Sequence, residues 1–144
     1  MIDEEVLVEK LRHINQYTDE LHQMRGISIE AYENDVMRRR AVERTFMNLI
    51  QACIDLSRHI RRGLDRDPQE SAKDEIVAIG DAGIISENVE AKMAEAVGFR
   101  NVLAHQYGDI NDKTVYDILH NDLHWFERFQ QQIAQWLQEQ DINT

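Results

Sequence analysis

The stretch from Asn34 to Gly63 most constrains the fold, because its pattern predicts one long helix without a proline. At about 100° per residue, the apolar side chains fall within a sector roughly 120° wide. They are Val42, Phe46, Leu49, Ile50, Cys53, Leu56 and Ile60. The opposite sector carries the arginines Arg40, Arg44, Arg58 and Arg62. The segment is therefore a helix with one apolar face and one polar, arginine-bearing face, capped by Asn34 or Asp35.

Further helical patterns flank this segment. Long ones run from about Asp3 to Met24, from Ser86 to Gly108 and from Lys113 to Gln138, with apolar residues at spacings of three and four. Short helices begin at Ser28 and Ser71. The chain has only one Pro and six Gly, a composition that favours long helices over a turn-rich β fold. The prediction is an all-α protein, an up-and-down helical bundle of four main helices plus short helices, forming one domain over residues 1–144 with a frayed C-terminus.

The net charge of −11 argues against a general nucleic-acid binder. The charge is unevenly distributed, however, because the stretch from Arg38 to Arg66 holds eight arginines against three carboxylates. One interpretation is a solvated helix face with local ion pairs, such as Asp55 with Arg58. The other is a track for phosphate groups, favoured by the absence of lysine from this stretch. The sequence leaves both open.

The single cysteine, Cys53, has no partner for a disulfide within one chain and suits a reducing compartment. The N-terminus is acidic, unlike that of a signal peptide, and no apolar run approaches the ~20 residues of a membrane span. We expect a cytoplasmic protein with no membrane association.

Four polar side chains end the third long helix: Arg100, Asn101, His105 and Tyr107. A guanidinium can hold a phosphate and an imidazole can move protons near neutral pH, so Arg100 and His105 suit phosphodiester chemistry without a metal. On a straight helix, however, they point about 140° apart, whereas Arg100 and Tyr107 lie about 20° apart. A working site needs either an unwound helix end or a second copy of the segment, and we favour a symmetric dimer.

Residues 100–107, RNVLAHQY, resemble the Arg-x4-His-x-Tyr motif of the HEPN superfamily (higher eukaryotes and prokaryotes nucleotide-binding domain). The chain is most similar to HepT-like toxins of the MNT/HEPN toxin–antitoxin systems. Residues 39–44, 50–56 and 97–99 also match the family pattern, so that the resemblance covers roughly residues 41–119.

The resemblance implies a homodimeric, metal-independent endoribonuclease toxin that cuts tRNA or other cellular RNA. Its partner would be a cognate nucleotidyltransferase antitoxin of the MNT type, which attaches AMP to Tyr107. Arg100 would then be the electrostatic clamp and His105 the proton-transfer group, with Asn101 either supporting the site or being an ordinary helix residue. The arginines of the long helix would guide RNA toward the site.

No cofactor or metal is expected. His120 and His124 have a spacing that suits a metal, but no third ligand accompanies them. The main alternative is a HEPN binding module without nuclease activity that recruits substrate for a partner nucleotidyltransferase. A helical scaffold with no nucleic-acid role is the third possibility.

Overall fold

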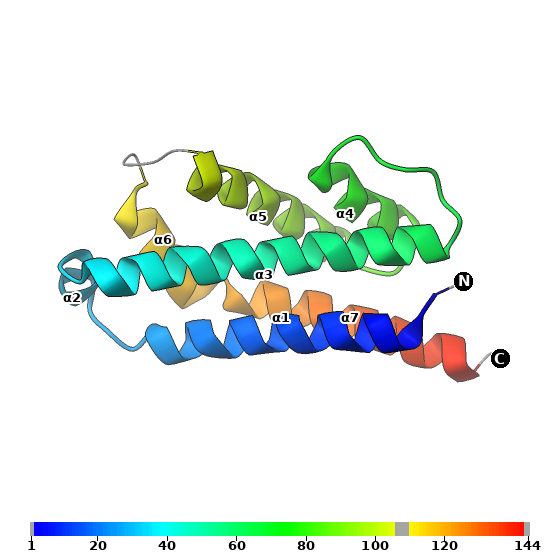
Figure 1. Ribbon diagram of the computed structural model, residues 1–144, viewed down its shortest axis with the longest axis horizontal. Helices are drawn as coiled ribbons and strands as arrows, with labels where there is room; N and C mark the ends of the chain where they lie inside the picture. The colour runs from blue at the N-terminus through cyan, green and yellow to red at the C-terminus, as the bar shows by residue number, and fades with distance from the viewer. Residues whose placement is uncertain (1, 106–109, 143–144) are drawn as a thin grey trace.

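The computed structural model describes residues 2–105 and 110–142, with the side chains of residues 2–105 and 110–140. Within those ranges the chain forms seven helices and no strand (Figure 1). The bounds are α1 (Glu4–Met24), α2 (Ile29–Glu33), α3 (Val36–Gly63), α4 (Ala72–Asp81), α5 (Glu87–His105), α6 (Asp112–Asn121) and α7 (Leu123–Ile142). The predicted all-α class is confirmed.

The four long helices α1, α3, α5 and α7 run alternately in opposite directions along the molecule (Figure 1). The helix α3 crosses the middle and contacts α1 on one side and α4 and α5 on the other. The helix α7 packs against α1, α5 and α6. The architecture is thus the predicted up-and-down bundle of four main helices with three short ones.

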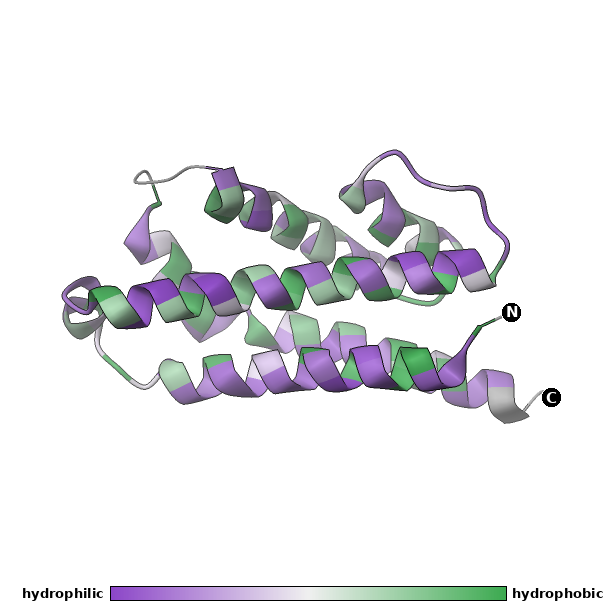
Figure 2. Cartoon of the chain, in the orientation of Figure 1, coloured by the Kyte–Doolittle hydropathy of each residue, from purple (hydrophilic) through white to green (hydrophobic). Residues whose placement is uncertain are grey.

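The core forms where the apolar faces of the long helices meet. The ring of Phe46 on α3 lies 5.4 Å from that of Phe99 on α5 and 6.4 Å from that of Phe126 on α7. Hydrophobic and hydrophilic bands alternate along α3 (Figure 2), as expected for a helix that buries one face. The apolar residues of α3 predicted for the core are buried, namely Val42, Phe46, Leu49, Ile50, Cys53, Leu56 and Ile60.

Short polar side chains set the starts of the helices, because each accepts a hydrogen bond from a free backbone N–H of the first turn. Ser28 caps α2, Asp35 caps α3 and Ser71 caps α4, in line with the sequence. Asn111 caps α6 by accepting from the Thr114 N–H at 3.1 Å. Local sequence therefore fixes where these elements begin.

In the C-terminal part of the chain, one predicted helix is in fact two. The sequence predicts a single helix over residues 113–138, but α6 ends at Asn121 and α7 begins at Leu123. Between them, Asp122 has φ −117° and ψ 1° and closes the end of α6. Asn and Asp side chains compete with the helical backbone for hydrogen bonds, which makes an Asn-Asp pair a weak point in a helix. The chain bends there.

None of the helices in residues 2–105 and 110–142 combines the length and apolar character needed to span a bilayer.

Candidate functional site

The candidate site lies at the C-terminal end of α5. Arg100 is half-buried, and its Nη1 donates a hydrogen bond of 3.2 Å to Oδ1 of the exposed Asn101. His105, the last residue of α5, is exposed. Arg100 is thus less exposed than His105. The supporting role of Asn101 stays a prediction.

The side of α5 that carries His105 is exposed and includes small residues beside Glu87 and Glu95. Ala91, Gly98 and Val102 are exposed there, and Val102 retains 37% of its surface. A Cβ added at Gly98 would meet no atom within 4 Å. Because small side chains let helix backbones approach closely, this face can accept another helix. Its position beside His105 agrees with a site completed by a second copy.

The arginines of α3 divide into two groups. Arg40 forms an ion pair with Glu43 at 3.2 Å, and Arg58 contacts Asp55 and Glu75, both at 3.5 Å. The predicted local ion pairs are therefore present on part of this face, and the phosphate track stays a prediction.

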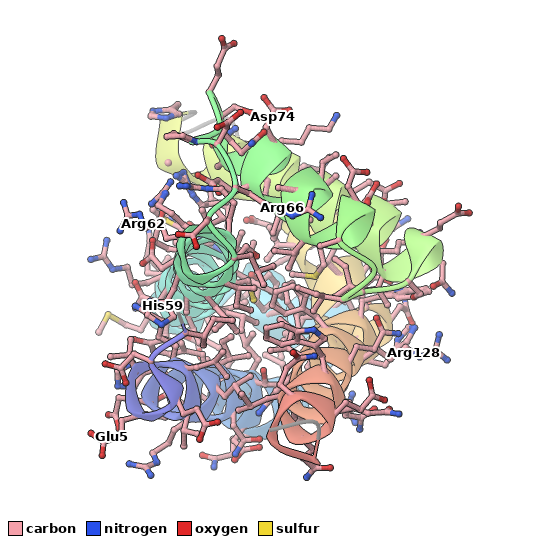
Figure 3. All side chains as sticks on the ribbon, turned by 90° about the vertical axis from the view of Figure 1, so that its right-hand side faces the viewer. Glu5, His59, Arg62, Arg66, Asp74 and Arg128 are labelled. Atoms are coloured by element: carbon pink, nitrogen blue, oxygen red, sulfur yellow. The ribbon has the colours of Figure 1, made fainter. Side chains whose placement is uncertain are left out.

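Arg44 and Arg62 are exposed and take part in none of the ion pairs found in the described residues. Their separation of 18 residues corresponds to five turns, about 27 Å, so they leave the helix on one side. Arg62 points outward at the end of α3 (Figure 3). These two guanidiniums remain available to an external anion.

A buried ion pair that the sequence pattern did not reveal joins α3 to α4. Arg61 Nε lies 2.9 Å from Glu75 Oε2, and its Nη2 lies 3.1 Å from Oε1, with side chains only 6% and 3% exposed. These hydrogen bonds raise the pKa of Arg61, which stays charged. In the sequence, the burial of Arg61 is indicated only by its position next to the apolar sector of the helix. Arg61 is thus a structural residue, unlike Arg62.

The two histidines with metal-like spacing are engaged elsewhere. His120 Nδ1 lies 3.0 Å from the carbonyl oxygen of Tyr116, and the His124 ring lies 4.8 Å from that of Trp125. Within residues 2–105 and 110–140, no three His, Cys, Asp or Glu side chains group to hold a metal ion.

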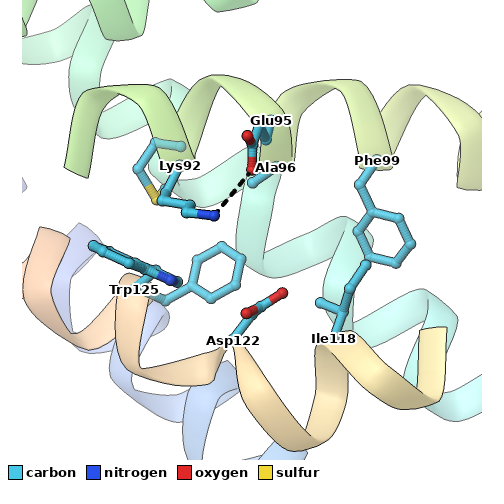
Figure 4. A pocket seen from close by; sticks show the side chains of 9 residues that line it. Lys92, Glu95, Ala96, Phe99, Ile118, Asp122 and Trp125 are labelled. Atoms are coloured by element: carbon cyan, nitrogen blue, oxygen red, sulfur yellow. Dashed lines mark ion pairs between the residues drawn. The ribbon is translucent and has the colours of Figure 1, made fainter. Parts of the chain in front are cut away.

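A small pocket lies between α5 and the junction of α6 with α7 (Figure 4). Phe99, Ile118 and Trp125 give it an apolar lining, and Lys92 at its rim pairs with Glu95 at 3.6 Å. Neither Arg100 nor His105 lines this pocket. The pocket is therefore separate from the candidate site, and its polar lining consists of Lys92, Glu95 and Asp122.

Tyr107, the predicted site of modification, lies outside the described residues, as does Gly108, the predicted end of the helix. The described part of α5 ends at His105. The role of Tyr107 stays a prediction.

Residues 14–133 match the model of the family described as Ribonuclease HepT-like. The matched range includes all of α3, α5 and α6. Two curated proteins are similar over most of their length. A tRNA nuclease HepT from Aphanizomenon flos-aquae is 27% identical over 93% of this chain and 92% of its own. An mRNA nuclease HepT from Shewanella oneidensis is 22% identical over 87% of this chain and 93% of its own.

A solved structure has the same fold. The tri-AMPylated Shewanella oneidensis HEPN toxin in complex with MNT antitoxin superposes with a TM-score of 0.84 at 23% identity. The match covers 93% of this chain and 98% of that chain. At this level of identity, the comparison supports the fold of the bundle.

Proposed function

Since the chain belongs to the Ribonuclease HepT-like family, we propose that it is a metal-independent endoribonuclease and the toxin of a toxin–antitoxin pair. The observation that carries the proposal is the family match over residues 14–133, which includes the α5 end where Arg100, Asn101 and His105 lie. Two similar proteins are named as HepT nucleases of RNA, one of tRNA and one of mRNA. The class of substrate is RNA.

The chemistry follows from the 2′-hydroxyl of RNA, which can attack the adjacent phosphate once a base removes its proton. The exposed imidazole of His105 is free to transfer that proton or to protonate the leaving oxygen. The guanidinium of Arg100, oriented by Asn101 at 3.2 Å, stabilises the negative charge that develops on the phosphorane. DNA lacks the 2′-hydroxyl and is not cut.

The active form is a homodimer in this proposal. Arg100 and His105 lie about 140° apart around one helix, so one copy does not bring the two groups together on one face. A second copy related by a twofold axis can supply the missing group, so that Arg100 of one chain and His105 of the other line one groove. The groove is then lined by both chains.

RNA approaches along the outer face of α3. Arg44 and Arg62 supply free positive charge there, whereas Arg40 and Arg58 are partly neutralised by carboxylates at 3.2–3.5 Å. Arginine forks bind phosphate oxygens in pairs, which suits a backbone track. We therefore assign the larger share of RNA guidance to Arg44 and Arg62.

The proposed partner is a nucleotidyltransferase antitoxin of the MNT type, which restrains the toxin by attaching AMP to Tyr107. The similar Shewanella oneidensis toxin is described as tri-AMPylated and in complex with MNT antitoxin. An AMP phosphate near Arg100 adds negative charge and bulk where the RNA phosphate binds. The pair acts in the cytoplasm, where its RNA substrates are.

The test is RNA cleavage by the purified chain in the presence of EDTA. Wild-type protein is expected to cut RNA and to leave DNA of the same sequence intact, whereas His105→Ala and Arg100→Ala are inactive. His124→Ala is the matched control, because His124 is exposed on another helix. RNA left intact by the wild type, together with normal growth of cells that express it, contradicts the proposal.

A further inference from the structure

Four polar side chains are gathered where α2, α3 and α6 meet. We call them the α2–α3–α6 cluster: Tyr32, Arg39, Glu43 and Asp112. Tyr32 is fully buried, and the side chains of Glu43, Arg39 and Asp112 are 8%, 14% and 33% exposed. Burying charged groups is unfavourable unless they meet partners, so each contact in the cluster constrains its neighbours.

Arg39 joins all three helices. It projects from α3, and its Nε lies 3.4 Å from Oδ2 of Asp112, the first residue of α6. Its Nη1 donates a hydrogen bond to the carbonyl oxygen of Glu33, the last residue of α2. One planar guanidinium thus holds the end of one helix and the start of another.

The members of the cluster influence one another electrostatically. The Tyr32 hydroxyl is buried without a hydrogen-bond partner in the described residues, and so is Arg39 Nε, which has only the ion pair to Asp112. Burial next to the carboxylates of Glu43 and Asp112 raises the pKa of Tyr32, which keeps its proton. The cluster therefore contains two donors and two carboxylates, of which Asp112 is the most exposed.

A second contact fixes α6 in the same place. The Tyr116 hydroxyl of α6 donates a hydrogen bond of 2.8 Å to the carbonyl oxygen of Ile27, just before α2. The rings of Tyr116 and Tyr32 are 5.7 Å apart. The start of α6 is thus anchored through both the guanidinium and the aromatic pair.

The anchor lies close in sequence to the candidate site, because Asp112 follows His105 by seven residues. We propose that Arg39 and Asp112 are positioning residues for the ribonuclease site, holding the start of α6 on α2 and α3 so that the end of α5 keeps His105 in place. They contact neither substrate nor the reacting atoms in this role. The inference rests on the proposed function for its kinetic test.

The kinetic test uses Arg39→Gln, Asp112→Asn and the double variant. Since small misplacements of a reacting group cost one to two orders of magnitude in rate, kcat is expected to fall about tenfold or more. KM for RNA should change less than about twofold, because Arg39 does not bind RNA in this proposal. The loss in the double variant should be smaller than the product of the two single losses, since both changes break the contact between Arg39 and Asp112.

Arg38→Gln is the matched control. Arg38 precedes Arg39 on the same helix, donates to the Met24 carbonyl oxygen at 3.2 Å and pairs with Asp35 at 3.8 Å, but among the described residues it forms no hydrogen bond or ion pair with α6. It is expected to keep the wild-type kcat. Equal losses in Arg38→Gln and Arg39→Gln, an unchanged kcat in Arg39→Gln, or a KM rise that accounts for the whole effect would each overturn the proposal.

Amide hydrogen exchange gives a readout independent of activity. In Arg39→Gln and Asp112→Asn, exchange should become faster in the first turn of α6 and in the last turn of α5, up to His105, and stay unchanged there in Arg38→Gln. An inactive wild type refutes the proposed function alone. Unchanged exchange at the α5 end refutes the positioning role, whatever the activity.

Discussion

Replacement of Glu75 by Ala is predicted to destabilise the bundle strongly. Glu75 holds Arg61 through two hydrogen bonds of 2.9 and 3.1 Å, and the two side chains are 3% and 6% exposed. Removing one partner of a buried pair leaves the other charge without compensation, at a cost of about 3–5 kcal/mol. For a chain of this length, that corresponds to a fall in Tm of about 10 °C.

The assay is urea unfolding followed by circular dichroism, with thermal melting as a second measure. Glu9→Ala is the matched control, because its pair with Arg12 at 3.1 Å has side chains 53% and 69% exposed and is worth about 0.5 kcal/mol or less. The double variant Arg61→Met with Glu75→Leu should recover most of the stability, since an apolar pair leaves no buried charge. A loss below about 1 kcal/mol in Glu75→Ala would refute the reasoning.

Three further outcomes are expected. Burial raises the pKa of Glu43, so the folded state favours its neutral form. Glu43→Gln should therefore be more stable than the wild type at pH 7, and this difference in stability should shrink as the pH falls toward 4.5. An equal difference at both pH values in urea unfolding would contradict this prediction. Arg44→Gln with Arg62→Gln should weaken RNA binding and reduce its salt dependence more than Arg40→Gln with Arg58→Gln, and equal salt slopes in filter binding would count against the assigned track. Intact mass after incubation with the cognate nucleotidyltransferase and ATP should increase by AMP units in the wild type but not in Tyr107→Phe, and an unmodified wild type would remove this part of the account.

Helix positions could be predicted from the sequence because their signals are local. The caps Ser28, Asp35 and Ser71 lie next to the helices that they start, and the apolar residues of α3 repeat at helical spacing. The break at Asp122 was missed, because the apolar pattern continues across it from Leu119 to Leu123. The periodicity of apolar residues indicates which face of a helix is buried, but it does not indicate where one helix ends and the next begins in another direction.

The geometry of the candidate site was only partly predictable. The divergence of Arg100 and His105 follows from five residues of helical rotation and agrees with their different exposure. The pairing of Arg61 with Glu75 and that of Arg39 with Asp112 join residues far apart in the chain, which no local pattern indicates. For this reason the sequence alone does not distinguish the arginines of α3 from one another, whereas the structure shows which are exposed and which hold helices together.

Subunit complementation tests most directly the central claim, an RNA-cutting groove lined by two copies of the chain. Arg100→Ala and His105→Ala are purified separately, mixed under conditions that exchange subunits, and assayed with RNA in EDTA. In the mixed dimer, one chain supplies Arg100 and the other supplies His105, so cleavage should rise at least about tenfold above either variant alone. If mixing restores no activity although mass spectrometry detects the mixed dimer, the site is not shared between two chains and the account is wrong.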